Sequence, residues 1–215
     1  MAKFERKVLI VEDEPLLRSL ISTALESDGF IVRGAATAAE ARTVADDFDP
    51  DVALLDIELG DGPSGIDLSL ILRKNSPEIA LVFLTHIPEP RVVGVDNKVI
   101  PRNAAYLVKD RIAEPGMVKA AIEAALRDRV GREFRDDKKS HPLSEVSRSQ
   151  LEVLKLVALG RSNGEIAQAR GTTIRAVENL VKRALESAGI NSGEGNARVL
   201  AAREFIKVAG LPHDK

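Results

Sequence analysis

The first 127 residues alternate short apolar runs with segments in which apolar residues recur every three or four positions. The apolar runs cover Lys7–Val11, Phe30–Arg33, Val52–Leu55, Ile79–Leu84 and Ala105–Val108. The spacing of leucine, isoleucine and alanine between these runs predicts amphipathic helices. Alternating strands and helices, with almost continuous apolar strands, are typical of a parallel sheet covered by helices on both faces. The pattern therefore predicts an α/β domain over residues 1–127.

The pattern changes after residue 127. Residues 128–146 are rich in charge, lack apolar periodicity and contain Pro142, which predicts a linker. Residues 147–215 return to helical spacing and predict an all-α, four-helix domain. Its expected helices are Ser147–Leu159, Asn163–Arg170, Thr173–Ala188 and Asn196–Val208.

The stretch between the fourth and fifth predicted strands is unfavourable for a helix. It contains Pro88, Pro90 and Pro101 together with Gly94. Proline inside a helix costs about 3 kcal/mol and glycine about 1 kcal/mol. We therefore expect the helix of this connection to be short, displaced or partly unwound.

Composition excludes several kinds of site. The chain of 215 residues has no cysteine, so disulfides, thiolate zinc sites and cysteine nucleophiles are ruled out, and its three histidines are widely scattered. No apolar run approaches the roughly 20 residues of a membrane span, and the N-terminus does not resemble a signal peptide. We expect a cytoplasmic protein without membrane contact. Residues 1–128 carry a net charge of −7 and residues 143–215 one of +3, which suggests different partners for the two domains.

Charged and polar residues follow the predicted strands at the edge where ligands bind in α/β sheets. Glu12 and Asp13 follow the first strand, Asp56 the third, Thr85 the fourth and Lys109 the fifth. Clustered carboxylates repel each other unless a cation joins them, and a site of oxygen ligands favours Mg²⁺. Single residues of these types are common in turns, but five of them at the ends of the first, third, fourth and fifth strands predict a site for phosphoryl chemistry.

The segments VLIVEDEPLLR, ALLDIELGDGPSGIDL, LVFLTH and AAYLVKD resemble the receiver domain of two-component response regulators. The resemblance implies a flavodoxin-like, doubly wound (βα)5 fold with a five-stranded parallel sheet, phosphorylated by a histidine kinase. It also implies the following roles: Asp56 is the phospho-acceptor; Glu12, Asp13, Asp56 and the backbone carbonyl of Glu58 hold Mg²⁺; Lys109 pairs with the phosphoryl group; Thr85 and Tyr106 are the switch residues.

The sequence departs from the receiver pattern in the loop after Asp56, at His86 and in the proline-rich stretch over residues 86–103. The fourth helix and fifth strand usually form the face that responds to phosphorylation. Here, because a short isolated helix is only marginally stable, we expect phosphorylation to order this stretch and to create a receiver dimer surface.

The second domain contains two short helices separated by a glycine turn, as in a helix-turn-helix. Any small three-helix bundle could share this pattern. However, the run SRSQLEVLKLVALGRSNGEIAQARGTTIRAVENLVKRALESAGI resembles the LuxR-type DNA-binding domain, and the whole chain resembles the NarL/FixJ subfamily of response regulators. The apolar positions Ile174, Val177, Val181 and Leu185 are expected to face inward. The candidate DNA-contacting residues are Thr173, Arg175, Glu178, Asn179, Lys182 and Arg183.

The sequence thus predicts a phosphorylation-regulated transcription factor that binds promoter DNA as a homodimer and has no activity besides self-phosphorylation and autodephosphorylation at Asp56. A receiver-based signalling module that acts through protein partners, with weak or no specific DNA binding, is the alternative. A phosphatase of the haloacid type is disfavoured because no second aspartate stands two residues after Asp56, where Glu58 is found.

Overall fold

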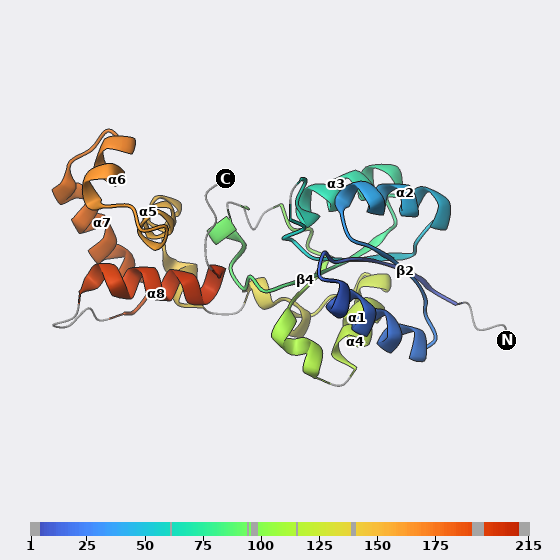
Figure 1. Cartoon of the computed structure of the whole chain (residues 1–215). Coiled ribbons are helices and arrows are strands. Elements are labelled where there is room, and N and C mark those ends of the chain that lie inside the picture. Colours follow the sequence, from blue (N-terminus) through green and yellow to red (C-terminus); the bar gives the residue numbers. More distant parts are fainter. Residues whose placement is uncertain are drawn as a thin grey trace. The chain divides into compact units, whose positions relative to one another are not determined.

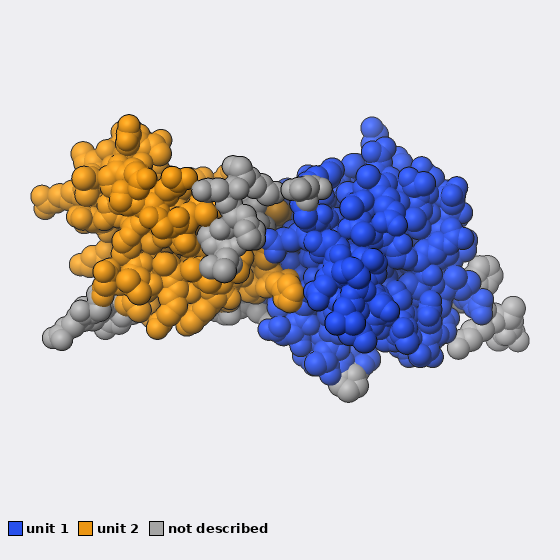
Figure 2. Space-filling view, viewed as in Figure 1, with its two compact units in different colours: residues 1–85, 98–138 blue, residues 86–97, 139–215 orange. Residues whose placement is uncertain are grey.

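The computed structural model describes residues 5–60, 62–93, 95, 99–114, 116–138, 141–190 and 196–210. The chain forms two compact units (Figure 2). We call residues 1–85 and 98–138 the α/β unit, and residues 86–97 and 139–215 the helical unit. This division departs from the predicted one in the connection between the last two strands and in the predicted linker.

The α/β unit is built on a five-stranded parallel sheet, as predicted. Its strands are β1 (Lys7–Val11), β2 (Ile31–Ala35), β3 (Val52–Leu55), β4 (Ala80–Thr85) and β5 (Ala105–Val108). They are arranged in the order β2-β1-β3-β4-β5. The residues of β3 and β4 are buried throughout, whereas the edge strand β2 is largely exposed.

Helices cover both faces of this sheet. They are α1 (Pro15–Ser27), α2 (Ala38–Phe48), α3 (Gly65–Asn75) and α4 (Met117–Leu126). In Figure 1, α2 and α3 lie on one face and α1 and α4 on the other. Local sequence sets where they begin: the Thr37 side chain accepts a hydrogen bond from the first turn of α2, and Ser64 forms a capping box with Asp67 in α3. The doubly wound fold is confirmed.

The connection between β4 and β5 forms no α-helix in its described residues. It contains only the short 3₁₀ helix η1 (Pro90–Val93), which agrees with the effect expected of its prolines. Gly94, another expected helix breaker, lies outside the described residues. For the described residues 86–93 the expectation of an unordered segment is wrong, because Ile87 and Val92 are buried in the core of the helical unit.

The first part of the predicted linker belongs to the α/β unit. Residues 132–138 form the 3₁₀ helices η3 (Arg132–Phe134) and η4 (Asp136–Lys138), and Arg135 forms a parallel bridge with Tyr106 of β5. The Asp136 carboxylate accepts a hydrogen bond from the Val108 amide at 2.9 Å. The linker assignment is therefore wrong here, because charged side chains that look solvated in sequence satisfy the backbone of an edge strand.

The helical unit contains the four predicted helices. They are α5 (Arg148–Ala158), α6 (Asn163–Ala169), α7 (Ile174–Ser187) and α8 (Ala197–Ala209), preceded by the 3₁₀ helix η5 (Pro142–Glu145). Val177, Val181 and Leu185 lie in the core, as expected. Ile174 does not: at the first position of α7 it is 52% exposed, so the buried stripe begins one turn later.

Candidate phosphoryl-transfer site

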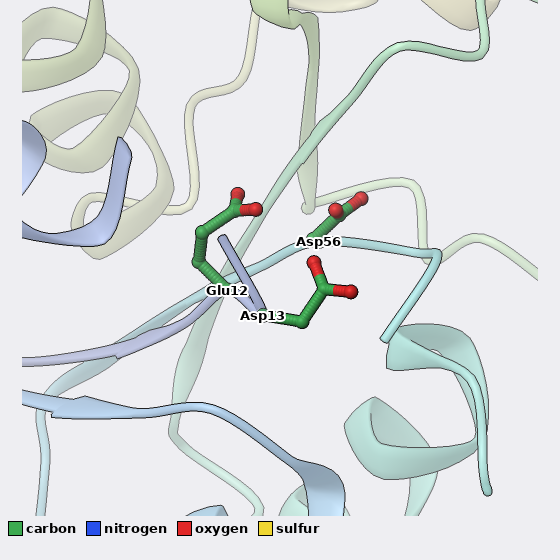
Figure 3. A group of neighbouring side chains, drawn as sticks. All are labelled: Glu12, Asp13 and Asp56. Atoms are coloured by element: carbon green, nitrogen blue, oxygen red, sulfur yellow. The ribbon is translucent and has the colours of Figure 1, made fainter. Parts of the chain in front are cut away.

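Three carboxylates meet at the carboxyl end of the sheet. Glu12 and Asp13 follow β1 and Asp56 follows β3, and each offers an oxygen atom within 4.8 Å of the others (Figure 3). Glu12 and Asp56 are buried, whereas Asp13 is exposed. Two of the three carboxylates are therefore buried and the third faces solvent, so a ligand can reach the cluster from bulk water.

Lys109 compensates the charge of the two buried carboxylates. Its Nζ lies 2.8 Å from Oδ2 of Asp56 and 2.8 Å from Oε2 of Glu12. The three side chains are each 5% exposed or less. Because buried charges must be paired, the lysine stabilises the ionised carboxylates where the strands β1, β3 and β5 end.

Burial and ion pairing shift the pKa values of these three groups in opposite directions. Loss of hydration raises the pKa of Asp56 and of Glu12, and the hydrogen bonds from Lys109 only partly offset this effect. Burial would lower the pKa of Lys109, but its hydrogen bonds and charge interactions with the two carboxylates outweigh burial and raise that pKa. A further positive charge beside the carboxylates would therefore be favourable.

The loop after Asp56 is held tightly against it. The Glu58 amide donates a hydrogen bond to Oδ1 of Asp56 at 3.2 Å, and the Gly65 amide donates to the Ile57 carbonyl at 3.0 Å. A Cβ at Gly65 would lie 1.8 Å from the Asp56 carbonyl oxygen, so only glycine fits. Gly65 thus allows the loop to lie against Asp56, a role that the residue spacing in the sequence did not reveal.

The two expected switch residues are buried next to this edge. Thr85 is the last residue of β4 and pairs in register with Val108, the residue before Lys109. Tyr106 is fully buried, with its ring centroid 6.2 Å from that of Phe83. The structure thus brings Thr85 to the strand end beside Lys109 and holds Tyr106 in the core.

Comparison with known proteins agrees with this geometry. Residues 8–97 match the family model of the response regulator receiver domain. The chain therefore carries a response regulator receiver domain. Its α/β unit is the receiver domain, which confirms the resemblance seen in the sequence, and the carboxylate cluster lies at the receiver's strand ends.

Relatives extend the likeness over both domains. The response regulator protein VraR of Staphylococcus aureus is 28% identical over 187 residues, covering 83% of this chain and 88% of VraR. A structure of two RcsB dimers bound to two parallel DNAs is 19% identical with a TM-score of 0.63, covering 95% of this chain and 99% of RcsB. RcsB from Salmonella enterica serovar Typhimurium, bound to a promoter in the presence of the phosphomimetic BeF3⁻, is 18% identical with a TM-score of 0.61, covering 95% and 100%. The receiver-plus-helical-domain fold is shared with these structures.

The second candidate surface of the chain is α7. All six candidate DNA-contacting residues lie at or near its start or along it, and all are exposed: Thr173, Arg175, Glu178, Asn179, Lys182 and Arg183. The Thr173 hydroxyl also caps the helix by accepting from the Ala176 amide at 3.2 Å. Lys182 lies 3.9 Å from Glu186, so its charge is only loosely paired.

In the part of the chain that the structure describes, no helix is both long and apolar enough to span a membrane.

Proposed function

We propose that this response regulator is a phosphorylation-regulated, DNA-binding transcriptional regulator that acts in the cytoplasm. Asp56 accepts a phosphoryl group from a histidine kinase, and the helical unit binds promoter DNA as a dimer. The observation that carries the proposal is the cluster of Glu12, Asp13 and Asp56 with Lys109 at the strand ends of the receiver.

In the proposed reaction, an Asp56 carboxylate oxygen attacks the phosphorus atom of a phosphohistidine. A new O–P bond forms, the P–N bond breaks, and the imidazole leaves with the electron pair and takes up a proton from solvent. Lys109 already lies within 2.8 Å of Asp56, so its ammonium stands where the added negative charge develops. No other activity is proposed besides the hydrolysis of this acyl phosphate.

The residues at the site fit Mg²⁺. The donors are three carboxylates, and oxygen donors of this kind suit a hard divalent cation. The backbone carbonyl of Glu58, whose amide donates to Asp56, would be a further oxygen ligand. When bound, Mg²⁺ supplies positive charge that neutralises the phosphoryl oxygens and the clustered carboxylates. Glu12, Asp13 and Asp56 would hold it, while Thr85 would hydrogen-bond the phosphoryl group after transfer.

DNA binding is proposed from α7. A helix of a helix-turn-helix reads the major groove when its outer face carries polar and basic side chains, and α7 exposes Arg175, Asn179, Lys182 and Arg183. VraR is named a response regulator protein, and RcsB has been seen bound to DNA, which supports the same role here. Glu178 on the same face repels phosphate but can accept from cytosine N4.

The proposal is tested by labelling the protein with a small phosphodonor in Mg²⁺. We expect wild type to take up one phosphoryl group per chain, Asp56→Asn to take up none, and chelation of Mg²⁺ to abolish labelling. Asp110→Asn is the matched control, since Asp110 is an exposed carboxylate beside Lys109. Stoichiometric labelling of Asp56→Asn would overturn the assignment.

A further inference from the structure

The first part of the connection that leaves β4 belongs to the helical unit and not to the receiver. Residues 86–97 cluster with residues 139–215 (Figure 2), although they lie between two strands of the receiver sheet. We call residues 86–93 of this connection the anchor segment. Its place in the helical unit rests on apolar packing and on one arginine.

Two apolar side chains of the anchor segment lie in the helical core. Ile87 is 1% exposed and Val92 is 4% exposed, and both belong to the same buried cluster as Leu143, Val146 and Leu151. Because burial of apolar side chains is favourable in proportion to the area removed from water, both side chains help to stabilise that core. Removing the anchor segment would therefore leave the helical core incomplete.

Arg91 fixes the anchor segment to the chain that leads into α5. Its guanidinium donates to the carbonyl oxygens of Leu143 at 3.0 Å, Ser144 at 2.6 Å and Val146 at 2.9 Å. Its Nε and Nη2 also donate to the two carboxylate oxygens of Glu89, at 2.9 and 3.0 Å. Arg91 thus satisfies carbonyls at the end of η5, immediately before the Ser147 cap of α5.

The anchor segment lies close in sequence to Thr85, one of the two expected switch residues. The anchor segment begins one residue after Thr85, and Ile87 is only two residues from it. Both ends of the connection are receiver strands, β4 and β5. The anchor segment is therefore joined by the chain itself to the receiver strand that ends at Thr85.

We propose that the anchor segment transmits phosphorylation to the DNA-binding unit. Resting on the proposed function, the inference is that movement of Thr85 toward a phosphoryl group on Asp56 draws Ile87 out of the helical core. The contacts of Arg91 with η5 then loosen, and so does the start of α5, against which α7 packs. The segment is a mechanical link, because a buried element has discrete packed positions and does not stretch freely.

Amide hydrogen exchange on the full chain tests this link, with BeF3⁻ and Mg²⁺ as the phosphoryl mimic. In wild type we expect the mimic to slow exchange at the receiver strand ends and to accelerate exchange in residues 141–158 at least about fivefold, the lower end of ordinary coupling between sites. In Arg91→Gln the receiver response should remain and the acceleration in residues 141–158 should be lost. Arg170→Gln is the control: its side chain is 27% exposed, against 26% for Arg91, and pairs with Glu152 within the helical unit.

The outcomes separate the two proposals. If the receiver responds while residues 141–158 of wild type exchange at the same rate or more slowly, the inference fails and the proposed function stands. If neither region responds, both fail. If Arg91→Gln keeps the full acceleration, or Arg170→Gln loses it, the assigned link is wrong. If Arg91→Gln unfolds the helical unit, the wild-type experiment alone decides.

Discussion

Replacing Ile87 by alanine should destabilise the helical unit and leave the receiver unchanged. Ile87 is 1% exposed and lies in the core of the helical unit, yet it stands only two residues after the end of a receiver strand. The substitution removes three buried carbons, worth about 2.4 kcal/mol of transfer free energy at about 0.8 kcal/mol each. The cavity left behind brings the expected loss in unfolding free energy to about 2–5 kcal/mol.

Tyrosine fluorescence distinguishes the unfolding of the two units. The chain has one tyrosine and no tryptophan, and Tyr106 is fully buried in the receiver core. Tyrosine fluorescence during urea unfolding therefore follows the receiver, while far-ultraviolet circular dichroism follows both units. With a slope of about 1–2 kcal/mol per molar urea, a loss of 3 kcal/mol shifts the midpoint of the helical unit down by about 1.5–3 M.

Ile174→Ala is the control, since it makes the same change at a position of the helical unit that is 52% exposed. Its unfolding free energy should stay within about 0.5 kcal/mol of that of wild type. A tyrosine transition that moves with Ile87→Ala, while the helical transition stays in place, would show that Ile87 stabilises the receiver. The reasoning about the anchor segment would then be refuted.

Three further predictions concern the two sites. Lys109→Ala should lower the unfolding free energy of the receiver by about 3–5 kcal/mol in thermal or urea melts without Mg²⁺, and added Mg²⁺ should restore part of this loss. The control Lys119→Ala, which breaks an exposed ion pair, should cost under about 1 kcal/mol. Equal losses in the two variants would contradict the role of Lys109 in pairing the buried carboxylates. Because burial raises the pKa of Asp56, protons should compete with Mg²⁺ as the pH falls through that raised pKa. The Mg²⁺ affinity measured by calorimetry should therefore be weaker at pH 5 than at pH 7. An affinity that does not change with pH would contradict this competition at Asp56. Lys182→Ala should reduce the slope of log affinity for DNA against log salt concentration by about 0.9. Glu178→Ala should strengthen non-specific DNA binding, measured over the same range of salt concentrations. A slope unchanged by Lys182→Ala, together with non-specific affinity unchanged by Glu178→Ala, would contradict α7 as the DNA-contacting surface.

Local patterns were enough to predict most of the fold. The runs at Lys7–Val11, Val52–Leu55 and Ala105–Val108 are strands with those same bounds, because fully buried parallel strands have continuous apolar sequences. The helices expected over Ser147–Leu159 and Asn163–Arg170 also form, and in the structure capping boxes at Ser147 and Ser162 mark where they begin. The carboxylates and Lys109 came together as predicted, since the carboxyl ends of parallel strands share one edge.

Contacts between distant segments could not be predicted in this way. The prolines indicated that no regular helix follows β4, but nothing local indicates that Ile87 and Val92 pack with residues more than 50 positions away. Similarly, Arg135 and Asp137 look like solvated linker charges, whereas they form a buried pair with a shortest distance of 2.7 Å beside β5. In both cases the partner that makes burial favourable comes from another part of the chain.

The central claim is that phosphorylation of Asp56 controls DNA binding. The direct measurement selects double-stranded DNA from a random pool, then titrates the selected sequence and a scrambled one at fixed salt with and without phosphorylation. We predict that phosphorylation tightens binding to the selected sequence at least about fivefold in wild type and not at all in Asp56→Asn. Equal affinity for the selected and scrambled sequences in both states would contradict the account and favour a module that acts through protein partners.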